Sequence, residues 1–121
     1  MSREVEPVED FIGTFSRAMQ SQNIDFLLER LHPAVTDLYG AEACQRYLPQ
    51  VIDHTFNIQI RNVGAQEPWM WEIDDRSTPI DEAYSVDAIV LSRGQTITTE
   101  MHLTPVDGLQ RWFTDCGEPL Q

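Results

Sequence analysis

The hydrophobic residues of this chain change their spacing once, close to His54, and that change limits the folds available to it. Before His54 they recur every three or four positions, and after it they alternate with polar residues. A period near 3.6 is typical of a helix with one buried face, and a period of 2 is typical of a strand with one buried face. We therefore expect an α+β fold, with helices first and a curved antiparallel sheet after them.

Three helices are predicted before the change in spacing. The apolar pattern places them at residues 8–19, at residues 24–31 and from residue 41 onward. Pro33 is expected to end the second helix, because the residue before a proline is pushed out of the helical region. Pro49 is expected to stop or kink the third helix, because its ring removes a hydrogen bond and clashes with the preceding turn.

Strands are predicted at residues 55–61 and 69–74, then at 84–92, 95–104 and 109–114, with a polar loop over residues 75–82. Arg93-Gly94 and Asp107-Gly108 are two-residue turns of the kind that join antiparallel strands. If Arg93 and Gly94 form the turn, one face carries the pairs Tyr84–Leu103, Val86–Met101, Ala88–Thr99 and Val90–Ile97. The other carries Ser85–His102, Asp87–Glu100, Ile89–Thr98 and Leu91–Thr96. A shift of one residue would turn a whole strand over, so two alternations that agree support this register. The second turn places Trp112 opposite Leu103.

Length and charge restrict the function further. The 121 residues suffice for one domain, residues 1–121, with one hydrophobic core. Eight basic against 20 acidic residues give a formal net charge of −12. Binding to nucleic acids or anionic membrane surfaces depends on Lys and Arg, so neither partner is expected.

The sequence shows no apolar run typical of a secretory signal or a membrane span, and Cys44 and Cys116 lack close spacing. We therefore expect reduced cysteines in a cytoplasmic protein, with Cys44 on an apolar helix face. The three histidines are far apart in the sequence and no glycine-rich phosphate loop occurs. No metal site or cofactor is expected.

Four segments in the same order resemble the nuclear transport factor 2-like superfamily, which includes ketosteroid isomerase-like and polyketide cyclase-like proteins. They are FSRAMQSQNID at residues 15–25, LLERLHP at 27–33, GAEACQRY at 40–47 and VDGLQRWF at 106–113. The resemblance covers nearly the whole chain. It implies a cone-shaped domain in which a curved sheet and helices enclose an apolar pocket, commonly within a homodimer packed through the sheets. A fold shared by many activities does not by itself carry one over.

Ketosteroid isomerase-like enzymes need a tyrosine on the first helix, a general-base aspartate at the pocket mouth and an acid on a central strand. The matching positions here hold Phe15, which has no hydroxyl to stabilise an oxyanion, and Met101, which cannot donate a proton. Asp37 lies near the general-base region. The resemblance therefore implies the fold without this chemistry, and no catalytic motif is recognised.

Our leading hypothesis is a domain that binds a small, mostly apolar molecule in the cone-shaped pocket. The expected pocket residues are Phe15, Met19, Tyr47, Trp71, Tyr84, Val86, Thr99, Met101 and Trp112, with Asp37 and Tyr39 as polar anchors. A second hypothesis is an isomerase, cyclase or epoxide hydrolase that uses Asp87, Glu100 and His102 on the sheet. These three lie on the polar face, where a solvated or dimer-facing surface is the alternative interpretation. A third hypothesis is an interaction domain that dimerises through Ile89, Leu91 and Phe113.

Overall fold

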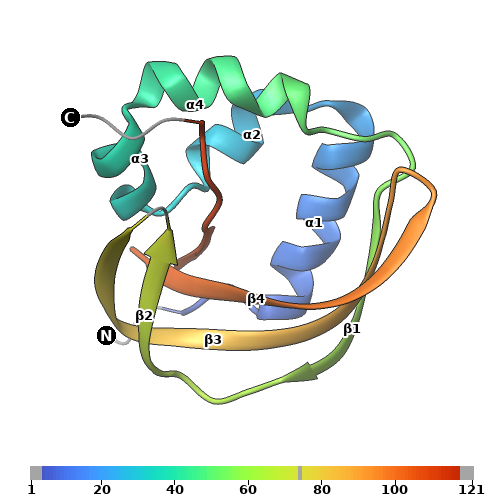
Figure 1. Cartoon of the computed structure of the whole chain (residues 1–121). Helices are drawn as coiled ribbons and strands as arrows, with labels where there is room; N and C mark the ends of the chain where they lie inside the picture. The colour runs from blue at the N-terminus through green and yellow to red at the C-terminus, as the bar shows by residue number, and fades with distance from the viewer. Residues whose placement is uncertain (1–3, 74, 118–121) are drawn as a thin grey trace.

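The computed structural model describes residues 4–73 and 75–117. Within these residues, four α-helices and one 3-10 turn precede five strands that are all paired antiparallel. The helices are α1 Val8–Ser21, α2 Ile24–Glu29, α3 Pro33–Tyr39 and α4 Ala41–Tyr47, followed by η1 Leu48–Gln50. The strands are β1 Asn57–Val63, β2 Glu67–Ile73, β3 Arg76–Ser92, β4 Gln95–Val106 and β5 Leu109–Trp112. The helices form one layer, and the sheet curves around it from the other side (Figure 1).

The helical part contains one helix more than the sequence predicted. Pro33 follows the end of α2 by four residues and begins α3. Proline fits the first position of a helix because the N–H that it lacks has no partner there. The Nδ1 atom of His32 caps the new helix by accepting from Ala34 N–H at 3.0 Å. Pro49 acts as predicted, since α4 ends at Tyr47 and a short 3-10 turn takes over.

The hairpin of β3 and β4 has the predicted register at every position from Tyr84–Leu103 to Ser92–Gln95. Trp112 also pairs with Leu103, as predicted. The strand order is β1-β3-β4-β5, with β2 paired to the first part of β3. The apolar face of β3 is the buried one, since Val86 and Ala88 are fully covered while Asp87 is exposed.

The predicted loop at residues 75–82 is wrong, because β3 already begins at Arg76. This first part of β3 pairs with β2, whereas β4 and β1 join only from Tyr84 and Val86 onward. At Pro79, β3 is therefore paired with β2 alone, and Pro79 lies opposite Met70. A proline is tolerated at such an edge because its missing N–H can face away from the ladder.

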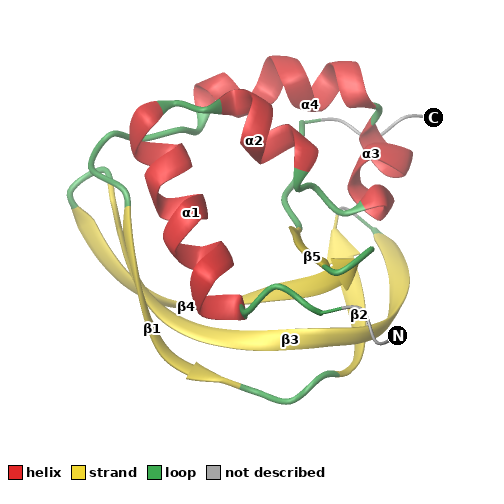
Figure 2. Ribbon diagram, turned by 180° about the vertical axis from the view of Figure 1, so that it is seen from behind, coloured by secondary structure: helices red, strands yellow, loops and turns green. Residues whose placement is uncertain are grey.

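Trp112 joins the two layers. Its ring packs edge-on against Phe15 of α1 with centroids 4.9 Å apart, and its Nε1–H donates to Leu27 O at 2.9 Å. The backbone beside it also bonds to the helical layer, with His32 N donating to Trp112 O and Trp112 N donating to Arg30 O, both at 2.9 Å. Figure 2 shows β5 lying between the helices and the rest of the sheet.

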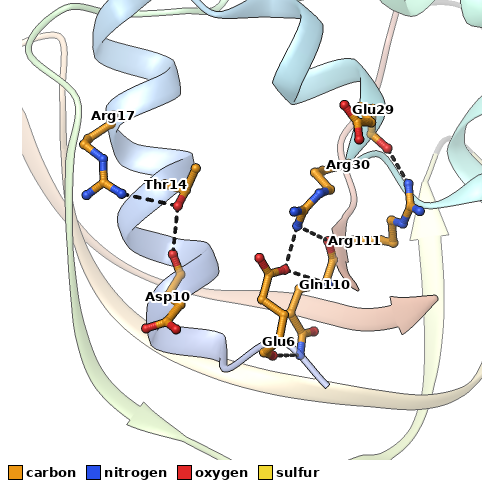
Figure 3. A network of polar contacts seen from close by, with 8 residues as sticks. All are labelled: Glu6, Asp10, Thr14, Arg17, Glu29, Arg30, Gln110 and Arg111. Carbon is orange, nitrogen blue, oxygen red and sulfur yellow. Dashed lines mark hydrogen bonds and ion pairs between the residues drawn. The ribbon is translucent and has the colours of Figure 1, made fainter. Parts of the chain in front are cut away.

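Glu6 ties the segment before α1 to the same region (Figure 3). Its carboxylate accepts from Arg30 Nη1 at 2.6 Å and from Gln110 N at 3.0 Å. The Gln110 side chain is fully buried and donates back to Glu6 O at 2.9 Å. The Arg30 guanidinium also lies over the ring of Phe26. A charge this poorly exposed is stable only with such partners.

The cysteines correct a prediction, because Cys44 and Cys116 form a disulfide with a Cα–Cα distance of 4.8 Å. Cys44 is fully buried on α4, as its place on an apolar face predicted, but it is not a free thiol. The 72 residues between the two cysteines hide their proximity in the sequence. No helix in the described residues has the length and apolar character that crossing a membrane requires.

Candidate functional site

Four rings form a continuous row of contacts from the N-terminal end of α3 to β4, and we call this row the aromatic ladder below. His32 stacks on Phe113 with centroids 4.7 Å apart, Phe113 meets Trp69 edge-on at 4.9 Å, and Trp69 stacks flat on His102 at 3.9 Å and 7°. Trp69 belongs to β2, while His102 belongs to β4 and Phe113 follows β5. The ladder therefore holds β2 against strands with which it shares no backbone pairing.

Each end of the aromatic ladder borders a surface concavity. The larger concavity has a volume of about 650 Å³ and includes His32. Its other lining residues are Gln66, Pro79, Ile80, Asp81, Glu82, Thr104 and Pro105. The smaller concavity, of about 220 Å³, includes Trp69 and His102. Ser85 and Glu100 line it as well, together with Ala65, Glu67, Pro68 and Ala83.

The larger concavity contains a hydroxyl group without a partner. Thr104 Oγ1 is buried and makes no hydrogen bond in the structure. A buried hydroxyl without a partner carries a free-energy cost of about 1–3 kcal/mol. Thr104 lines the concavity, but its hydroxyl oxygen is covered by neighbouring protein atoms.

His32 also lines the larger concavity. Burial lowers the pKa of His32, and the charge of Arg111 lowers it further against the opposite effect of Asp37. The ring is therefore neutral near pH 7. Because Nδ1 accepts from Ala34 N–H, the proton of the neutral ring is on Nε2, which can donate.

The smaller concavity contains a cluster of one hydroxyl, one carboxylate and one imidazole, which we call the acid–imidazole cluster. Ser85 Oγ donates to Glu100 Oε1 at 2.9 Å, and His102 Nε2 lies 3.1 Å from the same oxygen. Ser85 Oγ and His102 Nε2 are 3.4 Å apart. All three contacts meet at one side of the imidazole. In a serine hydrolase, by contrast, the acid and the hydroxyl bond to opposite ring nitrogens.

Burial lowers the pKa of His102, although the Glu100 carboxylate acts in the opposite direction. At pH 7 the imidazole is therefore neutral and can take up a proton. Glu100 is half-exposed and lines the smaller concavity, so a small molecule there can contact its carboxylate.

The structure brings together two of the three predicted catalytic residues. Glu100 and His102 share the acid–imidazole cluster, whereas Asp87 pairs with Glu100 in register but stays exposed outside the concavity. Ser85 was missed by the sequence analysis. The predicted register already placed it opposite His102, so a search for hydroxyl groups beside the histidine would have found it.

The expected pocket residues lie mainly in the hydrophobic core. Fully or nearly buried are Phe15, Met19, Tyr39, Trp71, Val86 and Trp112. Half-buried are Tyr47, Tyr84, Thr99 and Met101. None of them lines either of the two concavities at the aromatic ladder. An interior pocket walled by these side chains remains a prediction.

The two expected anchors lie on different faces of α3. Tyr39 is completely buried and Asp37 is exposed, as two-residue spacing on a helix requires. Tyr47 faces the C-terminal segment, where a hydrogen bond with Asp115 raises the pKa of the tyrosine hydroxyl. Phe113, expected at a dimer contact, packs within the chain against Trp69, Trp71 and His32.

The described residues contain no group of three or more His, Cys, Asp or Glu side chains that could hold a metal ion. Comparison of the chain with protein-family models, with curated proteins and with solved structures gave no match.

Proposed function

We propose that this protein is a small-molecule-binding domain and that its binding site is the larger concavity. The observation that carries the proposal is the concavity itself, which borders the aromatic ladder at His32 and is lined by Thr104, a residue whose buried hydroxyl has no hydrogen-bond partner. Native structures satisfy nearly all buried polar groups, with protein, water or ligand. If the atoms that cover Thr104 Oγ1 move aside, a ligand atom that bonds this hydroxyl would complete the site.

Size and composition support the same site. A volume of about 650 Å³ lies within the range of roughly 300–1,000 Å³ that small-molecule sites occupy. Ile80 and two prolines supply apolar surface, while His32, Gln66, Asp81, Glu82 and Thr104 supply polar side chains. A ligand in this concavity would find both apolar contacts and hydrogen-bond partners.

Thr104→Val tests the proposal, because it removes the hydroxyl and keeps the branched shape. Without ligand, the free energy of unfolding of the variant should equal that of the parent protein or exceed it by about 1 kcal/mol. The reason is that the substitution removes no hydrogen bond. Chemical-shift mapping with a fragment library should place bound fragments at Gln66 and Thr104, and the variant should weaken them. Thr98→Val, at an exposed position of the same strand, is the control. Fragments that bind only elsewhere would disprove the site.

A second candidate function is acid–base catalysis at the acid–imidazole cluster, favoured by the 3.1 Å contact between Glu100 and His102. A general test is 5-nitrobenzisoxazole, whose ring opens when a base removes its carbon-bound proton and the N–O bond breaks. Glu100→Gln should abolish any turnover of this probe, and Asp87→Asn should leave it unchanged. Equal loss in both variants would argue against the cluster.

Membership of the nuclear transport factor 2-like superfamily and a homodimer packed through the sheets are also proposals. The order of helices before a curved antiparallel sheet supports the first. Leu91, 36% exposed on the outer face of β3, supports the second. Leu91→Lys should convert a dimer into a monomer in sedimentation equilibrium, and an unchanged dimer would exclude this face.

A further inference from the structure

One edge of β4 is open over most of the strand. β4 pairs with β3 along residues 95–103, whereas β5 pairs with the other side of β4 only at residues 103–106. Among the described residues no further strand pairs with β4, and β5 lies beside one end of it (Figure 2). Residues 95–98 and Glu100 are exposed. Such a strand presents backbone N–H and C=O groups with which another strand can pair.

The turns at the two ends of β4 decide which backbone groups point to this open edge. Arg93-Gly94 and Asp107-Gly108 have positive φ at both positions, as two-residue type I′ turns require. The residues that flank such a turn exchange both hydrogen bonds, and bonded positions then alternate along the pair. From the first turn, the odd-numbered residues of β4 bond to β3, and from the second its even-numbered residues bond to β5. Both turns therefore direct the N–H and C=O groups of Thr96, Thr98 and Glu100 to the open edge.

This edge lacks the features that keep strand edges from pairing. Residues 95–102 contain no proline, lysine or arginine, and their register with β3 has no shift. The register of β1 is shifted at Arg61, and that of β2 is shifted at Pro68. Native sheets use bulges, prolines and charged side chains to prevent association through their edges. Of these three edges, that of β4 is the one left regular enough to pair.

The sequence of the open edge is complementary to itself in the antiparallel direction. When Thr98 lies on a two-fold axis, it faces Thr98 of a second copy, and Thr96 faces Glu100 of the second copy. The outward-facing groups of all three residues then form hydrogen-bonded pairs. The two Glu100 carboxylates are not opposite each other, a placement that would be unfavourable. Ile97, which is 49% exposed, gains Thr99 of the second copy as its neighbour.

We propose that this protein self-associates through the open edge of β4, so that the sheets of two copies join into one antiparallel sheet with Thr98 at the two-fold axis. The contact differs from a dimer packed through the sheet faces, because it uses backbone groups at the edge and leaves Leu91 uncovered. One strand per chain forms a small interface, so the association is reversible and depends on protein concentration.

Amide hydrogen exchange tests the edge residue by residue. When the protein concentration is raised from about 10 μM to 1 mM, exchange at Thr96, Thr98 and Glu100 should slow about threefold or more. Ile97 and Thr99 should be protected at both concentrations, because their amides bond to β3. Fast exchange of the three outward amides at both concentrations would overturn the proposal. Slow exchange at both would also overturn it, because the edge would then be covered within one chain.

Three variants that each add one positive charge test the register in sedimentation equilibrium at low salt. Thr98→Lys should weaken association about fivefold because it places two lysines opposite each other, and Thr96→Lys should strengthen it about fivefold because its lysine faces Glu100 of the second copy. Gln59→Lys, at an exposed position of β1, is the control and should leave the association constant unchanged. The proposal is overturned if Thr98→Lys associates as tightly as Gln59→Lys, and equally if Leu91→Lys is the variant that separates the two copies.

Discussion

Among the described charged residues before α1, Glu6 has the most partners, and it gives the first prediction at the scale of single residues. Glu6→Ala leaves Arg30 and Gln110 N without their acceptor in a poorly exposed place. The free energy of unfolding should fall by about 1–3 kcal/mol, because both donors lose a charged partner. Urea denaturation measures the loss, with Glu9→Ala as a control on the exposed side of α1. Equal effects of the two changes would contradict the role of Glu6.

The buried imidazoles predict how stability depends on pH. The pKa values of His32 and His102 are both lowered by burial, so the folded protein binds fewer protons than the unfolded chain below about pH 6.5. The contribution of these two histidines to the free energy of unfolding is therefore fully present above pH 6.5, and it decreases as the pH falls below that value. His102→Phe keeps a ring on Trp69 without a titrating group, and should reduce the difference between urea midpoints at pH 7.5 and 5.5. An unchanged difference would show that His102 is not involved.

At the scale of elements, local sequence determined more of the sheet than of the helices. Apolar and polar residues alternate on both sides of Arg93-Gly94, and only one pairing of β3 with β4 places the apolar residues of both strands on one face. The structure has that pairing. Helix α3 was missed because Pro33 was interpreted only as the end of a helix. At the first position of a helix a proline is tolerated, because the backbone N–H that it lacks would have no partner there. The first part of β3 was missed because Pro79 was read as a loop signal, whereas the strand has only one neighbour there.

The candidate site was predictable only where it depends on that register. Glu100 and His102 were found because pairing places them on one face, and Ser85 follows from the same pairing. The larger concavity was not predictable, since His32 and Thr104 come from elements 72 positions apart that meet through β5 and the aromatic ladder. Tertiary contacts of this kind leave no periodic pattern in a single sequence.

The β3–β4 hairpin depends on one carboxylate outside it. Asp53 accepts from Thr55 N, from Thr55 Oγ1 and from Arg93 N at the hairpin turn, and these hydrogen bonds lower the pKa of Asp53 to about 2. The turn is therefore held above pH 3.8 and released as the pH falls toward 2. Asp53→Asn should speed hydrogen exchange at Arg93 at neutral pH, while the amides of β5 keep their protection. Unchanged exchange at Arg93 would contradict this role.

At the scale of the whole molecule, the sheet and the helical layer are joined at their far end by the Cys44–Cys116 disulfide. Cys44 is on α4, and Cys116 follows β5 on the segment whose Asp115 also bonds to Tyr47. Our expectation of a cytoplasmic protein rested on reduced thiols, and the disulfide removes that support, because such bonds persist mainly in oxidising compartments.

The disulfide also predicts how the whole domain responds to reduction. It closes a loop of about 70 residues, for which the loss of unfolded-chain entropy stabilises the folded state by roughly 4 kcal/mol. Cys44→Ala/Cys116→Ala should therefore lower the free energy of unfolding by about 2–4 kcal/mol in urea, and a reducing agent should do the same to the parent protein but not to the variant. Thiol titration of the parent unfolded without reductant should find no free thiol. Two free thiols per chain would show that the cysteines meet without bonding, and the layers would then be joined by non-covalent contacts such as those of Trp112 and Arg111.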